Sequence, residues 1–328
     1  MNYFLGIDIA KDKFDAALLP EQGNRCRHRT FPNTTEGAQD LLHWLDQLQV
    51  AASEVHICQE ATSTYGLALA TFLHDHDYTL SLVNPYQVKR FAESELQRAK
   101  NDKQDAAVIA RFCRAHRPGP WNPLPAGLAE LQALARRLEA LEGMHTQEAN
   151  RLQVPGTPQA VQESIRTVLA TLEAQMDSIK EAIRQHFDRH PDLKAQRDLI
   201  DSITGIGETT ANTLLAEIGD YTVYKTARQL AAQAGLVPTE RQSGTSVHGH
   251  PQLSKQGNAR IRKALYLPAV VAMRFNPLLR SVAERLRAKG KHKMVIIGAI
   301  MRRLLHLVYG VLKSQKPFDP DYHLASAS

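Results

Sequence analysis

Four prolines within a span of eight residues constrain the fold of this chain more than any other feature: Pro118, Pro120, Pro123 and Pro125. Proline lacks a backbone N–H and clashes with the preceding turn of a helix, so such a segment fits a linker better than a helix or a central strand. The chain has 328 residues, which is enough for two or three compact units. We therefore expect a domain boundary at these prolines.

The segment before the prolines alternates short apolar runs with amphipathic stretches. Strands are expected at residues 3–9, 14–19, 55–58 and 79–83, with a polar turn joining the first two, and helices at 35–48, 65–74 and 106–115. Two antiparallel strands followed by strands that helices separate predict an α/β domain, in which helices cover the faces of a mixed sheet.

The segment after the prolines has helical periodicity. Apolar residues recur at spacings of three and four on either side of a Pro-Gly-Thr-Pro turn at residues 155–158. They are Leu131, Leu134, Leu138 and Leu141, then Ile165, Val168, Leu172, Met176, Ile179 and Ile183. This pattern predicts a helical hairpin or coiled coil that serves oligomerisation or domain spacing. From residue 195 onward the pattern is helical with glycine breaks.

One stretch, residues 294–312, is apolar enough to suggest a membrane span. Arg302, Arg303 and His306 lie in its middle, where a charge in lipid would be costly. We therefore expect a buried or DNA-facing helix and no membrane partner. The chain does not open with a secretory signal pattern, so we expect a cytoplasmic protein.

The charge is divided unevenly along the chain. The formal net charge is +6, but residues 1–221 hold 22 Lys and Arg against 30 Asp and Glu, a net charge of −8. Residues 222–328 hold 18 against 4, a net charge of +14. Such a basic segment on helices is typical of a protein that binds a polyanion, so nucleic acid is the first partner to consider. A solvated basic face without a partner is the alternative.

Four carboxylates stand at positions typical of functional side chains. Asp8 ends the first apolar strand, and Glu60 follows another strand, so the two could meet at the ends of neighbouring strands. Asp102 and Asp105 lie three residues apart at the start of a helix, where they share a face near the positive end of its dipole. Taken singly, each acid also has a structural explanation in a turn or a first helical turn.

Taken together, the four acids predict a metal-dependent site for phosphodiester chemistry. Two Mg²⁺ ions roughly 3.5 to 4 Å apart clamp the attacking and leaving oxygens in such reactions. Mg²⁺ prefers oxygen ligands and keeps several waters, so three or four carboxylates suffice, and Mn²⁺ can substitute. The three cysteines, Cys26, Cys58 and Cys113, are scattered and predicted to be reduced thiols, and no His or Cys cluster offers a competing metal site.

A glycine-rich turn at residues 202–211 resembles a helix-hairpin-helix motif, with Gly205-Ile-Gly207 between an apolar segment and a helix. Gly205 and Gly207 would let backbone N–H groups approach a phosphate, and the dipole of the second helix adds to this. This indicates DNA binding without sequence preference. A glycine-capped helix turn without a ligand is the alternative.

A serine, Ser243, lies in a polar stretch that contains glycine, which we interpret as a loop. A serine can attack phosphorus when a base or a metal activates it, although a solvated turn serine is the commoner case. Basic residues follow it and could position a phosphate backbone: Lys255, Arg260, Arg262 and Lys263.

These pieces, in this order, resemble the DEDD-type transposases of insertion sequence family 110, which a bridge RNA guides. The match runs nearly end to end. The residues that carry it are Gly6-Ile-Asp8-Ile-Ala-Lys11, Glu60-Ala-Thr-Ser-Thr-Tyr65, Asn84-Pro85, Lys100-Asn-Asp102-Lys-Gln-Asp105-Ala106, Ser202-Ile-Thr-Gly-Ile-Gly207, Ala234-Gly235-Leu236-Val-Pro238 and Ser243-Gly-Thr-Ser246. One departure is Ser63, which stands where many relatives have glycine.

The resemblance implies an α/β RuvC-like, RNase H-type nuclease domain at residues 1–120 and a linker with a coiled-coil helical hairpin at 121–192. A mainly α-helical transposase domain with the helix-hairpin-helix is implied at 193–328. It gives Asp8, Glu60, Asp102 and Asp105 the role of metal ligands, and Ser243 that of a nucleophile which forms a transient phosphoserine link to DNA. It also implies dimers that pair into tetramers, and a structured guide RNA that base-pairs with donor and target DNA.

Three other functions remain open from the residues alone. A junction-resolving endonuclease would use the same acids with water as its nucleophile. An actin-like or sugar-kinase-like phosphotransferase would share only the first strand, and it would need a second glycine-rich phosphate loop that is not visible. A non-catalytic nucleic-acid-binding protein would have no use for the four acids. The leading hypothesis is an RNA-guided DNA recombinase that excises and inserts its own mobile element.

Overall fold

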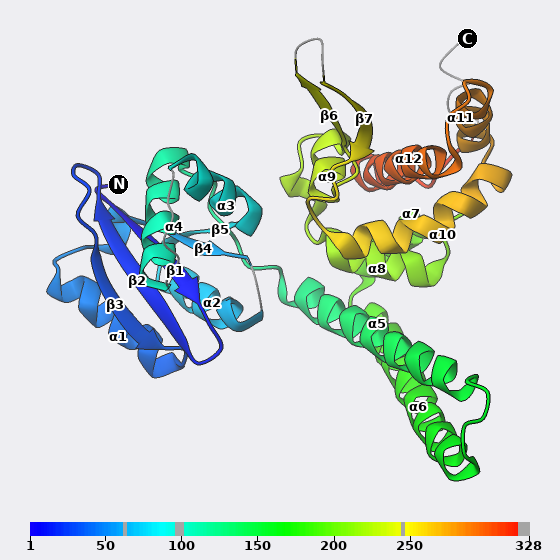
Figure 1. Ribbon diagram of the computed structural model, residues 1–328, viewed down its shortest axis with the longest axis horizontal. Helices are drawn as coiled ribbons and strands as arrows, with labels where there is room; N and C mark the ends of the chain where they lie inside the picture. Colours follow the sequence, from blue (N-terminus) through cyan, green and yellow to red (C-terminus); the bar gives the residue numbers. More distant parts are fainter. Residues whose placement is uncertain (62–63, 96–101, 244–246, 321–328) are drawn as a thin grey trace. The chain divides into compact units, whose positions relative to one another are not determined.

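The computed structural model describes residues 1–61, 64–95, 102–243 and 247–320, and of residues 64, 102–103, 240–243 and 247–251 it describes the backbone alone. The chain divides into two compact units, Met1–Pro123 and Leu124–Ser328 (Figure 1). Each unit has its own hydrophobic core.

The first unit is a mixed α/β domain. Its elements are β1 (Tyr3–Ile9), β2 (Lys13–Pro20), β3 (Arg27–Pro32), α1 (Thr35–Gln47), the short helix η1 (Ala52–Glu54), β4 (Val55–Glu60), η2 (Thr64–Gly66), α2 (Leu67–Asp75), β5 (Thr79–Val83), α3 (Pro85–Ser94) and α4 (Asp102–His116). The strands form a five-stranded sheet in the order β3-β2-β1-β4-β5. β1, β2 and β3 pair antiparallel, whereas β4 is parallel to β1 and β5 is parallel to β4. The expectation of a mixed sheet is therefore confirmed.

Helices cover both faces of this sheet. On one face, Ile7, Phe14 and Ile57 pack with Leu41 of α1 and Leu73 of α2. On the other face, a smaller cluster joins the sheet to α3 and α4; its members include Phe4, Cys58, Val88, Ile109 and Phe112. Because side chains alternate along a strand, residues of β1 with even numbers, Asp8 among them, face α4.

One strand of the sheet, β3, was not expected from the sequence. Arg27, His28, Arg29 and Thr30 are polar, and only Phe31 of this strand is buried. β3 is an edge strand with a single buried residue, so its sequence lacks the alternation that marks a half-buried strand.

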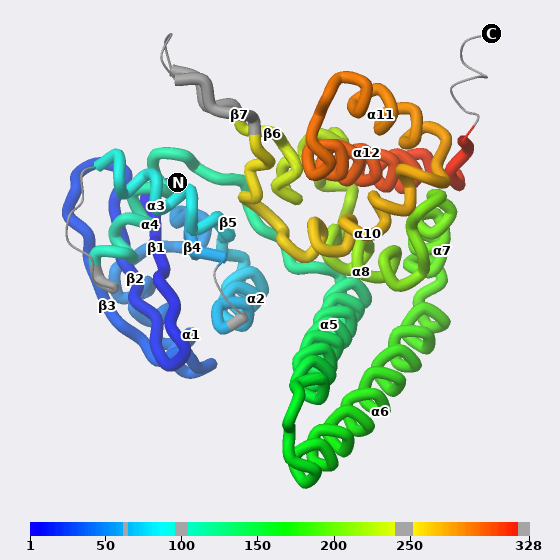
Figure 2. Tube along the Cα trace, turned by 45° about the vertical axis from the view of Figure 1, so that its right-hand side comes forward, coloured from blue at the N-terminus to red at the C-terminus, as the bar shows by residue number. Residues whose placement is uncertain are grey.

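The second unit is mainly helical. Its elements are α5 (Ala126–Leu152), α6 (Gln159–Arg189), α7 (Pro191–Asp201), α8 (Glu208–Ile218), the short helix η3 (Tyr221–Val223), α9 (Ala227–Gln233), β6 (Pro238–Ser243), β7 (Val247–Leu253), α10 (Ala259–Phe275), α11 (Pro277–Ala288) and α12 (Lys293–Ser314). The two longest helices, α5 and α6, form the expected helical hairpin (Figure 2). Leu131 of α5 and Phe187 of α6 belong to the same apolar cluster as α7, α8, α10 and α12, so the base of the hairpin is part of this unit's core.

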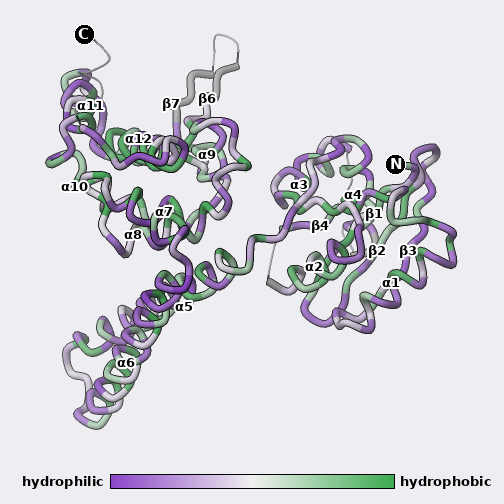
Figure 3. Tube along the Cα trace, turned by 180° about the vertical axis from the view of Figure 1, so that it is seen from behind, coloured by the Kyte–Doolittle hydropathy of each residue, from purple (hydrophilic) through white to green (hydrophobic). Residues whose placement is uncertain are grey.

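The helix α12 forms the centre of that core. In the described part of the chain it is the one helix long and apolar enough to cross a membrane, and it is green over much of its length in Figure 3. Of its most apolar 18-residue window, 61% is buried inside the unit, including Ile300, Leu304 and Leu305. The expectation of a buried helix is confirmed.

The second unit also contains a two-stranded antiparallel sheet that the sequence did not indicate. β6 and β7 form a hairpin in which Ser243 pairs with Val247. Ser243 is therefore the last residue of a strand, and the expectation that it lies within a loop was wrong. Both strands are polar, and β7 contains Pro251, so neither has the apolar alternation that would have predicted it.

Candidate active site

Two of the four acids stand at the carboxyl ends of neighbouring parallel strands. The register pairs Ile7 of β1 with Gln59 of β4, so Asp8 and Glu60 are the next residues on the two strands. Both lie on the face that packs against α4, because Gly6 and Cys58, two positions earlier, contact that helix. Both acids are half-buried. Backbone pairing alone thus holds these two carboxylates side by side.

A close contact brings a third acid to the same edge of the sheet. A Cβ atom on Gly6 would lie 2.1 Å from the carbonyl oxygen of Ala106 and 2.3 Å from the backbone nitrogen of Ala110. Only glycine allows the backbone of α4 to approach β1 this closely. Asp105 immediately precedes Ala106 and is half-buried. The glycine two residues before Asp8 therefore places the first turn of α4 beside the end of β1.

The fourth acid, Asp102, is the first residue of α4, and its side chain lies outside the described residues. It is one helical turn before Asp105. At this end the free N–H groups and the helix dipole favour negative charge. Ser63, the departure from the family pattern after Glu60, lies outside the described residues.

A fifth acid, Asp15, was missed from the sequence. The antiparallel register sets Asp15 of β2 directly opposite Asp8, so the two side chains lie on the same face of the sheet. The Asp15 carboxylate is buried and accepts hydrogen bonds from Thr30 Oγ1 at 2.6 Å, His28 Nε2 at 2.8 Å and Lys13 Nζ at 3.2 Å. Burial alone would raise the pKa of Asp15, but these hydrogen bonds from Thr30, Lys13 and His28 outweigh it and lower the pKa. Asp15 is therefore ionised beside Asp8.

A second residue that sequence reasoning missed, Asn33, connects the two turns that follow Asp8 and Glu60. Its Nδ2 atom donates to the carbonyl oxygens of Ala10 at 3.1 Å and Lys11 at 3.3 Å, in the turn after β1. The same atom donates to the carbonyl oxygen of Tyr65 at 3.2 Å, in the segment after β4. Asn33 thus fixes the spacing of the two segments that carry the acids. No sequence pattern marks it, because its partners are backbone atoms.

The segment after Glu60 has a further internal support. The buried side chain of Gln59 donates from Nε2 to the carbonyl oxygen of Gly66 at 3.0 Å. A Cβ atom on Gly66 would lie 2.1 Å from that nitrogen, so the glycine leaves room for the amide. The backbone nitrogen of Ala61 donates to Val83 at the end of β5, at 2.9 Å. The strand ends around Glu60 are therefore held in place by the protein itself.

The donor set at this edge suits a hard divalent cation. Carboxylate oxygens from Asp8, Glu60 and Asp105 are the ligands that Mg²⁺ and Mn²⁺ prefer. In the described part of the chain, two groups of side chains have ligand atoms within 4.8 Å of one another: His56 with Cys58 and Cys113, and Glu130 with His186 and His190. Neither group includes Asp8, Glu60 or Asp105. The expectation that no His or Cys cluster offers a competing metal site was therefore wrong. These residues meet through the fold and not through a sequence motif.

The candidate nucleophile, Ser243, belongs to the second unit, and its side chain lies outside the described residues. The base of its hairpin is firmly anchored. The backbone nitrogen of Ser254 donates to Val237 at 2.9 Å and that of Asn258 donates to Gln233 at 2.8 Å. Leu253 packs against Gly298 of α12, where an added Cβ would lie 3.0 Å from its side chain.

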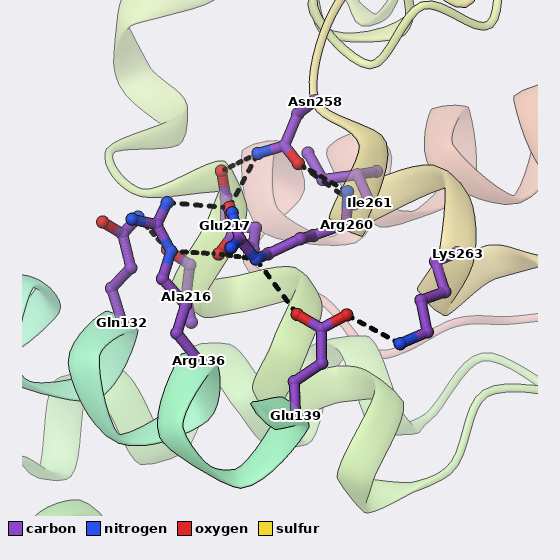
Figure 4. Close-up of polar contacts among 9 residues, drawn as sticks. All are labelled: Gln132, Arg136, Glu139, Ala216, Glu217, Asn258, Arg260, Ile261 and Lys263. Atoms are coloured by element: carbon purple, nitrogen blue, oxygen red, sulfur yellow. Dashed lines mark hydrogen bonds and ion pairs between the residues drawn. The ribbon is translucent and has the colours of Figure 1, made fainter. Parts of the chain in front are cut away.

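Three of the candidate phosphate-binding cations have partners inside the unit. Arg260 Nε lies 3.0 Å and Lys263 Nζ lies 2.8 Å from the carboxylate of Glu139 on α5 (Figure 4). Arg262 Nη1 donates to the carbonyl oxygens of Ala234 and Gly257, at 3.0 and 3.1 Å. Arg262 therefore holds the base of the β6–β7 hairpin. Lys255 adopts a positive φ of 53° at the same base.

The glycine turn predicted to bind DNA connects α7 to α8. Gly205 has a φ of +107°, and an added Cβ would lie 2.8 Å from Ala272 Cβ on α10. Gly207 precedes α8 as its N-cap, with no side-chain hydrogen bond to the first turn and open space where a Cβ would stand. The N–H groups of this helix end are thus accessible to an anion, although Glu208, which pairs with Arg197, adds a negative charge there.

These features define a class: an enzyme that acts on DNA, with acids gathered at the strand ends of one unit and a basic, helical second unit. Residues 5–154 match a DEDD transposase model of IS110, and residues 197–284 match the model of the IS116/IS110/IS902 transposase family. The chain belongs to the IS116/IS110/IS902 family of transposases. Membership in a DEDD transposase family indicates the use of a divalent metal.

Relatives of known name agree over nearly the full length. The chain is 34% identical to the pilin gene-inverting protein of Moraxella bovis, over 98% of each chain, and 33% identical to that of Moraxella lacunata. It is 23% identical to an uncharacterized protein of insertion element IS110 from Streptomyces coelicolor, over 95% of this chain and 94% of the relative.

Proposed function

We propose that this transposase is an RNA-guided DNA recombinase that excises and inserts its own mobile element. The observation that carries the catalytic part is the convergence of Asp8, Glu60 and Asp105 on one edge of the sheet, through the β1–β4 register and the contact of Gly6 with α4. The name of the Moraxella relatives, pilin gene-inverting proteins, is consistent with cutting and rejoining DNA.

In this proposal Asp8, Glu60, Asp102 and Asp105 hold Mg²⁺, as two ions, with Mn²⁺ as a substitute. Bound by these residues, the metal would supply positive charge to stabilise the negative charge that builds up on the phosphate in the transition state. Asp15 does not need to bind metal, because three donors already satisfy it; its ionised carboxylate adds to the negative potential beside Asp8. This first unit, residues 1–120 in the proposal, is the RuvC-like, RNase H-type nuclease domain.

Ser243 is the proposed nucleophile. Its Oγ loses a proton and forms a bond to phosphorus, while a P–O bond of the DNA breaks and the departing oxygen takes up a proton. In the second step, a hydroxyl of another DNA strand attacks the phosphoserine and regenerates the serine. Phosphate ester bonds are conserved through both steps, so rejoining needs no external energy source. Because the acids and Ser243 lie in different units, the two could come from different subunits.

The basic second unit is proposed to bind the nucleic acids. The α7–α8 turn, a helix-hairpin-helix in the proposal, presents Gly205 and Gly207 to a phosphate. The phosphate backbone of the DNA is positioned by four basic residues, Lys255, Arg260, Arg262 and Lys263. The hairpin of residues 121–192 serves as a coiled-coil spacer or oligomerisation element, and residues 193–328 as the transposase domain. Dimers that pair into tetramers act with a structured guide RNA on donor and target DNA, at the nucleoid.

The decisive experiment traps the covalent link. Purified protein is incubated with Mg²⁺, the RNA that flanks its element, and matching end-labelled DNA, and denaturing gels are scanned for a DNA strand bound to protein. The link should form with the wild type and with Ser254→Ala, at the base of the same hairpin, and should vanish with Ser243→Ala. Recombined product from Ser243→Ala would rule out the serine mechanism.

The closest alternative is a junction-resolving endonuclease that uses water as its nucleophile. The same samples distinguish the two mechanisms. If Ser243→Ala still cuts DNA but forms no covalent link, the endonuclease alternative is supported.

The metal ligands are tested separately. Asp8→Asn should abolish cutting while DNA binding persists. Asp12→Asn, an equal charge change in the exposed turn after β1, should leave cutting intact. Omitting the RNA should abolish recombination if guidance is correct.

A further inference from the structure

The base of the helical hairpin gathers three metal-binding side chains that the proposed reaction does not use. Glu130 lies near the start of α5, His186 in the last turn of α6, and His190 between α6 and α7. One ligand atom from each lies within 4.8 Å of the others. All three belong to the second unit, whereas the four proposed Mg²⁺ ligands belong to the first.

His186 is the unusual member of this group. It is completely buried, and within the described part of the chain neither of its ring nitrogens makes a hydrogen bond. Its Nδ1 lies 3.3 Å from Glu130 Oε2, a contact that is not aligned as a hydrogen bond. A buried ring whose nitrogens lack hydrogen-bond partners destabilises the fold, and a bound metal ion would satisfy such nitrogens.

The two histidines are arranged on one helix face. Residues four apart on a helix lie one above the other, and the rings of His186 and His190 are 4.4 Å apart between centroids. The His190 ring packs against α5 at Gly127, where an added Cβ would lie 3.2 Å from its Cε1 atom. The glycine thus leaves room for the ring beside Glu130, which stands one turn further along α5.

We propose that Glu130, His186 and His190 bind a divalent transition-metal ion of the zinc class, with water in the remaining position. Two imidazoles and one carboxylate suit Zn²⁺, Co²⁺ or Ni²⁺ and discriminate against Mg²⁺ and Ca²⁺, which take oxygen ligands. The ion would join α5 to the end of α6 and the start of α7. It would therefore fix the direction in which the hairpin leaves the core.

An arginine competes with the ion for the Glu130 carboxylate. Arg189 Nη2 lies 3.0 Å from Glu130 Oε1, so a guanidinium already occupies one of the two oxygens. The other oxygen faces His186. Arg189 is exposed, and its removal should leave all three ligands while taking a positive charge away from the site.

The test uses the full-length protein, stripped of metal and held in excess Mg²⁺, with Co²⁺ as the spectroscopic probe. We expect Co²⁺ to bind with d–d absorption and without thiolate-to-metal charge transfer. Glu130→Gln and His190→Gln should each weaken Co²⁺ binding by about tenfold or more. Arg189→Gln should tighten it, an effect that simple damage to the fold would not produce. Circular dichroism checks that each variant is folded.

His145→Gln is the matched control. His145 also faces a carboxylate across the same hairpin, with its Nε2 3.1 Å from Glu173, but it has no third ligand in the described part of the chain. Its loss should leave Co²⁺ binding unchanged. The proposal is overturned if Glu130→Gln and His190→Gln bind Co²⁺ like the wild type. It is also overturned if the spectrum shows thiolate ligands that Cys113→Ala removes, since the ion would then sit between His56, Cys58 and Cys113.

Discussion

Gly6 and Ala106 touch so closely that a methyl group between them is impossible: a Cβ on Gly6 would lie 2.1 Å from the carbonyl oxygen of Ala106. This contact sets the distance between β1, which carries Asp8, and α4, which carries Asp105. The glycine two residues before the first acid is therefore part of the site's geometry.

Replacing Gly6 with alanine should push α4 away from β1. The clash is with helix backbone, so we expect a loss of about 3 kcal/mol in the free energy of unfolding, the upper part of the range for overpacked cores. DNA cleavage should fall more steeply than stability, because Asp105 moves with the helix. Gly143→Ala is the control, since its Cβ meets nothing within 4 Å on the exposed face of α5. Equal urea midpoints for the two variants would contradict this reading.

Replacing Asn33 with alanine should separate the turns after Asp8 and Glu60. The lost hydrogen bonds are partly exposed, so the loss of stability should be only about 1 kcal/mol. Cleavage should need more Mg²⁺ than in the wild type, because the acids are then less well held. Asn2→Ala removes a comparable amide that bonds Glu54 at 2.8 Å, and its Mg²⁺ dependence should match the wild type. Identical Mg²⁺ titrations for both variants would refute a positioning role for Asn33.

Asp15 should make stability depend on pH. Its pKa in the folded state lies below the ordinary value of 3.8, so its ionised form stabilises the fold above that value. This contribution is lost as the pH falls through the folded-state pKa. Asp15→Asn should therefore destabilise the protein most at neutral pH, and the difference should shrink between about pH 5 and pH 2. Urea unfolding across this range measures it, and a difference that does not change with pH would contradict the assignment.

Glu139 holds two of the proposed phosphate-binding cations, Arg260 and Lys263. Glu139→Gln should release Lys263 and loosen Arg260, whose Nε also lies 4.0 Å from the buried Glu217, and it should tighten binding to non-specific duplex DNA. The salt dependence of binding should steepen by about one unit of slope for each further phosphate that the protein neutralises. Glu142→Gln, one turn further along α5, removes the same charge without touching either cation. If both variants shift DNA affinity equally, Arg260 and Lys263 do not bind the phosphates.

Strong periodicity made most of the architecture predictable. The strands around Asp8 and Glu60 and the helix that begins at Asp102 bury apolar faces, which leave a clear signature in the sequence. The hairpin of α5 and α6 was predictable from its periodicity, although Val168 in the apolar stripe of α6 is 42% exposed. The strands β3, β6 and β7 are mostly polar, so they have no apolar alternation in the sequence that could have predicted them. Their stability comes from pairing and from a few contacts such as Phe31 and Leu253.

The acids at strand ends could be identified from the sequence, but their supports could not. Asp15 lies inside an apolar run, and two of its three partners come from β3, the strand that was not predicted. Asn33 acts on backbone carbonyls, and Glu130 meets His186 across 56 positions of sequence. Such contacts depend on tertiary packing, for which local periodicity has no signal.

The β6–β7 ribbon that ends at Ser243 has two strands, and within the described chain no third strand pairs with either edge. A ribbon of this kind has little stability of its own beyond its anchored base. If Ser243 is the nucleophile, a further strand or surface, of protein or nucleic acid, that pairs with an edge of the ribbon would stabilise the strand that carries it. The hairpin would then make DNA cleavage depend on the assembly of the complex that also rejoins the DNA strands.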